Sequence, residues 1–225
     1  MSIHLQKELS KIKKSILTLG AMVEERVRLS VESIVMFDTD LAAKVIASDI
    51  DVDEMEVEIE EECLKILALH QPVAVDLRFI VAVIKINNEL ESIADQAVNI
   101  AERVQVMAKL QEHPFVFDYS VMAEKAQNML KKSLDSLVKQ DLPLAFKVLS
   151  LDDEVDELKS KAYDEIKKVM TTNPDNIGYL INLLLISRHL ERLADHAENI
   201  AEEVIYQIEG EIVRHGRRIN HDYTN

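Results

Sequence analysis

Apolar residues recur every three or four positions along most of this chain, which is the spacing of one face of an α-helix. The first stretch shows it well, with Ile12, Ile16, Leu19, Val23 and Val27 in this rhythm. Prolines and clusters of Asp, Asn and Thr interrupt the pattern, and a residue before proline disfavours helix. The pattern therefore predicts six helices, over residues 3–37, 41–69, 75–111, 119–139, 145–170 and 177–209.

A nineteen-residue segment occurs twice in the chain. INNELESIADQAVNIAERV covers residues 86–104, and ISRHLERLADHAENIAEEV covers residues 186–204. Eleven positions are identical, each 100 residues apart, and they include an acidic pair in each copy, Glu91 with Asp95 and Glu191 with Asp195. A duplication that keeps both its packing residues and its carboxylates indicates two similar halves, each with a candidate acidic site.

The two halves also match outside this segment. Residues 22–24 (MVE) pair with residues 122–124 (MAE) at an offset of 100, and residues 52–55 (VDEM) pair with residues 155–158 (VDEL) at an offset of 103. We place the length changes in turns, where insertions cost little. The sequence thus predicts an all-α fold of two tandem, pseudo-symmetric three-helix bundles, residues 1–112 and residues 113–225 with a short C-terminal tail.

The carboxylates of the repeated segment lie on one helical face. Glu91, Asp95, Asn99 and Glu102 fall within about 80° of one another, opposite the apolar residues. Like charges four residues apart destabilise a helix, and bases normally separate them. Residues 91–102 nevertheless contain no Lys or Arg. The acidic face is therefore either simply solvated or a site for cations.

The second and fifth predicted helices begin with acidic runs of their own. The first run contains Asp49, Asp51, Asp53, Glu54 and Glu56, and the second contains Asp152, Asp153, Glu154, Asp156 and Glu157. Acidic residues near a helix start interact favourably with the helix dipole, which explains some of them. Two facing carboxylate stripes would supply hard oxygen ligands, which suit Mg, Ca, Mn or Fe better than structural zinc.

The composition limits the classes of partner and compartment. A formal charge of −15 disfavours direct nucleic-acid binding. The one tight basic group, Arg214, His215, Arg217 and Arg218, we interpret as a C-terminal tail. A single cysteine, Cys63, indicates a core residue in a reducing compartment. The chain opening lacks a signal peptide's apolar block and no segment is long enough to span a bilayer, so we expect a soluble cytoplasmic protein.

Signatures of enzymes are missing from the chain. None of its seven histidines has the Glu-x-x-His spacing of di-iron bundles. There is no Gly-rich phosphate loop, Gly-x-Ser-x-Gly or His-Glu-x-x-His. His189 and His196 flank the second acidic pair and could join a site, although solvent-facing imidazoles are commoner. We expect that the protein is not an enzyme.

The segments ELESIADQAVNIAE and HLERLADHAENIAE resemble the paired signature of the PhoU family of phosphate-uptake regulators. QPVAVDLRFI, MVEERV and EMEVEIEEEC are similar to other parts of the family pattern, and the resemblance covers about residues 3–215. The chain departs from it at Ala94 and Ala194, where many members have glycine. Arg78 also has no counterpart in the second half, where Gly178 stands, so the two sites need not be equal.

The resemblance implies a cytoplasmic accessory of the phosphate ABC transporter that damps phosphate-starvation signalling. It implies contacts with the transporter's ATPase subunit and a PhoR-type sensor histidine kinase, a homodimer, and membrane contact only through these partners. It also implies metal ions (iron, zinc, manganese or magnesium) and no organic cofactor. The expected ligands are Glu91, Asp95, Glu191 and Asp195, with Asp49, Asp53, Asp152 and Asp156 on neighbouring helices.

Two other functions remain open at this point. A metal-storage or buffering helical bundle would take up metal stoichiometrically without binding a transporter. A purely structural helical scaffold would do neither.

Overall fold

The computed structural model describes residues 3–110 and 115–213, and it contains helices and no strand in those ranges. The predicted all-α class is confirmed. The first half contains α1 (Ile3–Met36), α2 (Thr39–Ala47), α3 (Ile50–His70) and α4 (Ala74–Met107). The second half contains α5 (Ser120–Lys139), α6 (Leu142–Leu149), α7 (Asp152–Thr172), the short 3₁₀ turn Pro174–Asn176 and α8 (Ile177–Glu209). The predicted boundary between residues 112 and 113 lies outside the described residues.

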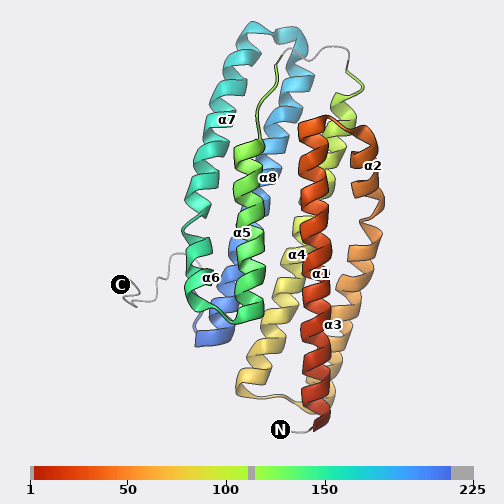
Figure 1. Cartoon of the computed structure of the whole chain (residues 1–225), viewed down its shortest axis with the longest axis vertical. Helices are drawn as coiled ribbons and strands as arrows, with labels where there is room; N and C mark the ends of the chain where they lie inside the picture. The colour runs from red at the N-terminus through yellow and green to blue at the C-terminus, as the bar shows by residue number, and fades with distance from the viewer. Residues whose placement is uncertain (1–2, 111–114, 214–225) are drawn as a thin grey trace.

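The helices form two three-helix bundles that lie side by side (Figure 1). In one bundle α1, α4 and the α2–α3 pair pack together, and in the other α5, α8 and the α6–α7 pair do so. The bundles meet mainly along α4 and α8, which run in opposite directions at the centre of the molecule. One continuous cluster of buried apolar side chains runs through both bundles. None of the described helices has the length and hydropathy that a bilayer span requires.

The second and fifth predicted helices are each broken once. The break between α2 and α3 lies at Ser48 and Asp49, and the break between α6 and α7 lies at Ser150 and Leu151. The Ser48 hydroxyl donates to the carbonyl of Val45, and this kind of local bond competes with helical hydrogen bonding. The expected continuous helices are therefore wrong in detail, although each pair still fills the place of one helix in its bundle.

Aspartates begin the short helices in both halves. Asp38 Oδ1 accepts from the backbone N–H groups of Asp40 and Leu41, each at 2.9 Å, and Asp141 Oδ1 accepts from Leu144 at 3.0 Å. These bonds satisfy N–H groups that the first turn of a helix leaves without partners. Gly210 ends α8 with a φ of 79°, a conformation that glycine adopts without strain, as predicted.

Buried serines show how α1 corresponds to α5. The hydroxyls of Ser30 and Ser33 donate to backbone carbonyls three residues earlier, and those of Ser133 and Ser136 do the same. The serines and the capping aspartates Asp38 and Asp141 are all 103 residues apart. The predicted offset of 100 between these helices is therefore wrong. The offset is 103 from α1 to α3 and falls to 100 at α4, so the length change lies in the α3–α4 and α7–α8 connections.

Candidate functional site

Five carboxylates gather where α3 packs against α4, and we call them the first acidic cluster: Asp49, Asp53, Glu56, Glu91 and Asp95. Burial raises the pKa of Asp49, and the negative charges of Asp53 and Asp95 raise it further. The pKa values of Glu91 and Asp95 are also raised, mainly by burial and then by neighbouring carboxylates. These four predicted ligands of the first half therefore lie together and repel one another.

Two polar residues fix the geometry of the first acidic cluster. Asn87, buried on α4, donates from Nδ2 to the Glu56 carbonyl at 2.9 Å and to Glu56 Oε1 at 3.1 Å. Arg26, buried on α1, donates to the carbonyl of Ser48 at the α2–α3 break and lies 3.7 Å from Asp51 Oδ2. Burial lowers the pKa of Arg26, while nearby aspartates oppose that effect. Arg26 thus places one guanidinium charge behind the cluster, and the charge of Arg192 on α8 also lowers the pKa of Asp95.

The second acidic cluster lies where α7 packs against α8: Asp152, Asp156, Glu191, Asp195 and Glu198. Burial raises the pKa of Asp152 and of Asp195 to about 6, with neighbouring carboxylates adding to the effect. The pKa of Glu198 rises to about 7, first through burial and then through the charge of Asp152. A proton or a cation is therefore favoured at this cluster near neutral pH.

Lys159 distinguishes the second acidic cluster from the first. Its Nζ lies 2.5 Å from Glu191 Oε1 and 3.8 Å from Asp156 Oδ1. The hydrogen bond to Glu191 is the main cause of the raised pKa of Lys159. At the offset of 103, Lys159 corresponds to Glu56, so an ammonium group stands where the first half has a carboxylate.

The other differences between the halves change the position of charge. Met129 stands at the place of Arg26, so the second acidic cluster has no guanidinium behind it. Glu198 stands at the place of Val98 and adds a carboxylate near Asp152. The two clusters share four carboxylates at equivalent positions but differ in the groups at the places of Glu56, Arg26 and Val98.

Between the clusters, α4 and α8 exchange hydrogen bonds. His189 Nδ1 donates to Gln96 Oε1 at 2.9 Å, and His196 Nδ1 donates to Glu89 Oε2 at 2.7 Å. Asn199 Nδ2 donates to the same Glu89 oxygen at 3.1 Å. The expectation of solvent-facing imidazoles is wrong for both histidines, because they bridge the two bundles. His196 also lowers the pKa of Asp95 and of Asp195, so its charge acts on both clusters.

The donor chemistry of both clusters suits a hard cation, but their geometry is open. Carboxylate oxygens are the ligands that Mg²⁺, Mn²⁺ and Fe ions accept readily. Among the described residues, no three His, Cys, Asp or Glu side chains converge closely enough to hold one ion. Glu191 would also have to leave Lys159 before it could bind one. A bound ion would therefore require side-chain rotation in the first cluster and loss of an ion pair in the second.

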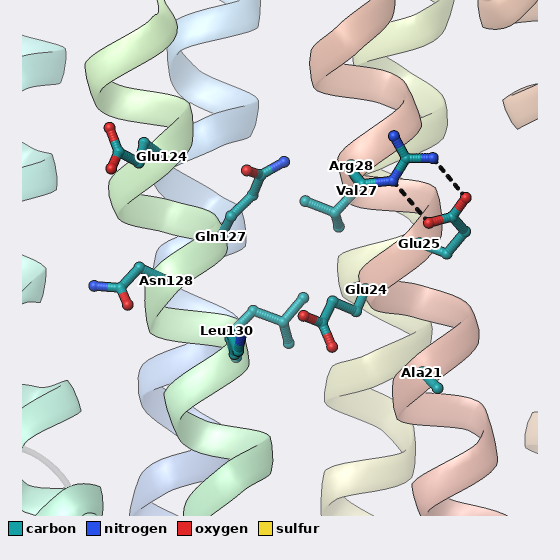
Figure 2. A pocket seen from close by; sticks show the side chains of 10 residues that line it. Ala21, Glu24, Glu25, Val27, Arg28, Glu124, Gln127, Asn128 and Leu130 are labelled. Atoms are coloured by element: carbon teal, nitrogen blue, oxygen red, sulfur yellow. Dashed lines mark hydrogen bonds and ion pairs between the residues drawn. The ribbon is translucent and has the colours of Figure 1, made fainter.

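A groove of about 440 Å³ lies between α1 and α5, as Figure 2 shows. Its lining residues form five pairs at the offset of 103: Ala21 with Glu124, Glu24 with Gln127, Glu25 with Asn128, Val27 with Leu130, and Arg28 with Lys131. Arg28 donates to Glu25 across 2.7 and 2.8 Å within the wall of the groove. The groove therefore lies on the pseudo-two-fold axis that relates the halves.

All eight predicted site residues fall in the two clusters, four in each. Glu56 was noted in the sequence as part of an acidic run but was not assigned to a site, and Glu198, Lys159 and Arg26 were not predicted to lie near one. Alignment of the halves at an offset of 103 gives a signal for Lys159 and Arg26. In that alignment, Lys159 corresponds to the acidic Glu56 and Arg26 corresponds to the uncharged Met129. Cys63 is buried, as predicted, and burial raises its pKa to about 12. The basic group at residues 214–218 lies outside the described residues.

Comparison with known proteins gives matches over nearly the whole chain. The sequence model of a family described as the PhoU domain matches residues 16–104 and 119–204, two segments that begin 103 residues apart. A protein of Aquifex aeolicus named "Phosphate-specific transport system accessory protein PhoU homolog" is 39% identical over 213 residues, 95% of this chain and 96% of that protein. A Clostridium acetobutylicum protein of the same name is 32% identical over 92% of this chain and 95% of its own length.

Solved structures with the same arrangement of helices are also known. The crystal structure of PhoU from Pseudomonas aeruginosa matches with a TM-score of 0.88 at 34% identity, over 92% of this chain and 99% of that one. PhoU from Streptococcus pneumoniae, described as a phosphate transport system regulatory protein, matches with a TM-score of 0.85 at 27% identity, over 93% of this chain and 99% of that one. Sequence and fold agree on the same relatives.

Proposed function

Because this chain belongs to the PhoU family, we propose that it is a non-enzymatic accessory protein of a phosphate-specific ABC transporter. In this proposal it also acts as a negative regulator of phosphate-starvation signalling. The observation that carries the proposal is the match at 39% identity, over 95% of the chain, to a protein named as such an accessory. The expected partners are the transporter's ATPase subunit and a PhoR-type sensor histidine kinase. The protein works in the cytoplasm, as a homodimer, and reaches the membrane through these partners.

The geometry supports a role in binding. Among the carboxylates, the largest increases in pKa are in the second acidic cluster, and those of the first cluster are raised as well. These clusters offer charge to a basic partner or a cation. Cys63, the one thiol, is buried in the core.

Deletion of the gene in the bacterium that encodes it tests the regulatory function. The expected result is phosphatase expression and altered phosphate uptake even when phosphate is plentiful, restored by the wild-type gene. Unchanged expression and uptake at high phosphate would contradict the proposal. Pull-down of the purified ATPase subunit tests the transporter contact separately.

The raised pKa values of the clusters favour metal binding as a further part of the proposal. Asp49, Asp53, Glu91 and Asp95 would hold an ion in the first half, and Asp152, Asp156, Glu191 and Asp195 in the second. The ion (iron, zinc, manganese or magnesium) would neutralise their mutual repulsion. Elemental analysis of protein purified without chelator tests this, with Glu91→Ala/Asp95→Ala and Glu191→Ala/Asp195→Ala as variants. The ligand assignment fails if neither variant loses bound metal.

A metal-storage or buffering bundle is the alternative, favoured by the same carboxylates. It predicts metal uptake in proportion to protein without any contact with the ATPase subunit. The combination of metal analysis and pull-down therefore separates the two functions.

A further inference from the structure

The outer face of α3 carries three exposed apolar side chains in a line, which we call the α3 stripe: Ile50, Val57 and Leu64. They are 61%, 50% and 53% exposed and lie seven residues apart. At 100° per residue they fall within about 40° of one another, opposite the face that buries Val52 and Ile59. Single exposed apolar residues are ordinary, but heptad spacing along one helix is the pattern that packs against another helix.

The second half provides an internal comparison for the α3 stripe. At the offset of 103, the positions of Ile50, Val57 and Leu64 are occupied on α7 by Asp153, Ser160 and Lys167, which are all exposed. The core-facing positions keep their burial, as Val52 and Val155 show. The fold of a half therefore does not require apolar residues on this outer face. The α3 stripe is not needed for packing of the three-helix bundle.

The charges beside the stripe indicate what covers it. Glu54, Glu58 and Glu61 are exposed along one side of it. The whole of α3 carries eight acidic residues and one lysine, whereas α7 carries seven acidic residues and four lysines. A second copy of this chain would bring two such acidic rims together, which is unfavourable. A helix with apolar residues flanked by Lys and Arg would instead match both the stripe and its rim.

We propose that the α3 stripe is a docking surface for a basic amphipathic helix of a partner protein. This goes beyond the proposed function, which places no partner on any face of the molecule. The apolar line supplies the contact area and the acidic rim steers and orients the helix. α3 lies at the outer edge of its bundle, where a partner helix can lie along it (Figure 1).

The test measures binding of a fluorescent basic peptide of about three heptads, with Leu at a and d and Lys or Arg at e and g. A peptide of the same composition in scrambled order is the matched probe. The full chain should bind the patterned peptide at least about tenfold more tightly than the scrambled one. Ile50→Ser/Val57→Ser/Leu64→Ser should lose this difference, and Glu54→Gln/Glu58→Gln/Glu61→Gln should weaken binding and its salt dependence.

Val121→Ser/Val138→Ser, which removes exposed apolar residues from α5, is the control and should bind like wild type. Circular dichroism and thermal unfolding check that each variant folds, and the single variants Val57→Ser and Leu64→Ser replace the triple variant if it does not. Equal affinity for the two peptides, or an unchanged affinity in the stripe variants, overturns the proposal. A wild-type dimer in ultracentrifugation that the triple serine variant abolishes also overturns it, because the occupant is then a second copy.

Discussion

Glu89 on α4 and His196 on α8 join the two bundles, with Oε2 of one 2.7 Å from Nδ1 of the other. The equivalent positions, Gln96 and His189, form the same contact in reverse order at 2.9 Å. The two pairs are images of each other about the pseudo-two-fold axis, but only one of them contains a carboxylate. The contact between α4 and α8 is therefore symmetric in the positions of its residues and asymmetric in their charge.

Removal of the Glu89–His196 contact should destabilise the fold. We expect a double-mutant cycle of Glu89→Ala and His196→Ala to give a coupling energy of about 0.5–2 kcal/mol in urea unfolding. Glu89→Ala should cost more than His196→Ala, because Asn199 also donates to Glu89. The same cycle on the exposed pair Arg28 and Glu32 should give a clearly smaller coupling energy. A coupling energy of zero for Glu89 and His196 would show that their contact does not contribute to the stability of the fold.

Loss of Lys159 should leave the Glu191 carboxylate without the ammonium group that pairs with it. The Glu191 side chain is only 15% exposed, so Lys159→Met should reduce the free energy of unfolding by about 1–3 kcal/mol. Lys159→Met/Glu191→Met should recover part of this loss, since it removes the uncompensated charge. Lys11→Met, at a far more exposed ion pair, should change stability by at most about 0.5 kcal/mol. Chemical denaturation of all four proteins in chelator measures the effect.

Lys159→Glu copies the residue of the first half into the second acidic cluster. Without added cation, the variant should unfold at a lower temperature than wild type because one more carboxylate joins the cluster. Added Mn²⁺ or Mg²⁺ should raise the melting temperature of the variant more than that of wild type. A smaller cation response in the variant would contradict this account of Lys159.

Glu198 should make the protein more stable as the pH falls. Its pKa in the fold is about 7, above the ordinary value of 4.5, so the folded chain binds a proton that the unfolded chain has lost. This contribution is complete below about pH 4.5 and disappears as the pH rises through 7. Glu198→Gln should therefore be more stable than wild type at pH 8, with little difference at pH 5. Urea unfolding across this range in chelator checks the sign, with the exposed Glu61→Gln as control.

His189 should make the protein less stable as the pH falls, the opposite of the effect of Glu198. Burial, together with the charge of Arg103, lowers its pKa to about 4, whereas an ordinary histidine titrates near 6.5. Its contribution is complete above pH 6.5 and is lost as the pH falls towards 4. His189→Gln, which can still donate to Gln96, should lose less stability than wild type between pH 6.5 and 4. An unchanged loss of stability between pH 6.5 and 4 would mean that the pKa of His189 is the same in the folded and the unfolded chain.

The repeating spacing of apolar residues was enough to predict where the long helices lie, because each buries one face. The sixth predicted helix and α8 agree at both ends. Asn173-Pro174 shortly before its first residue and Gly210 directly after its last residue are strong local signals.

The break at Ser48 was not predicted, because the buried residues Val45 and Val52 keep helical spacing across it. The contact of Arg26 with the Ser48 carbonyl does not cause it, since the second half has the equivalent break with Met129 at the place of Arg26. In both halves the serine at the break donates to a carbonyl three residues earlier, which is a weak signal in a sequence.

The sequence pointed to four of the five carboxylates in each acidic cluster, but not to Glu56 or Glu198 as members, nor to the basic groups near them. Repetition identified Glu91, Asp95 and their copies, and the neighbouring helices supplied the other four carboxylates. Which groups oppose them depends on packing: Lys159 is three residues from Asp156 in sequence but forms its short bond with Glu191 on α8. The predicted homodimer and bound metal ions stay predictions that the experiments above address.

The reciprocal pairs across α4 and α8 have a consequence for how such a chain could arise. Each half places residues 89 and 96, or their copies, against the other half in the arrangement of a two-fold symmetric dimer. A half-length ancestor could have paired with itself through this helix before its gene was duplicated and fused. In a fused chain the two copies no longer have to be identical. In this chain, one histidine lies against the carboxylate of Glu89 and the other against the amide of Gln96.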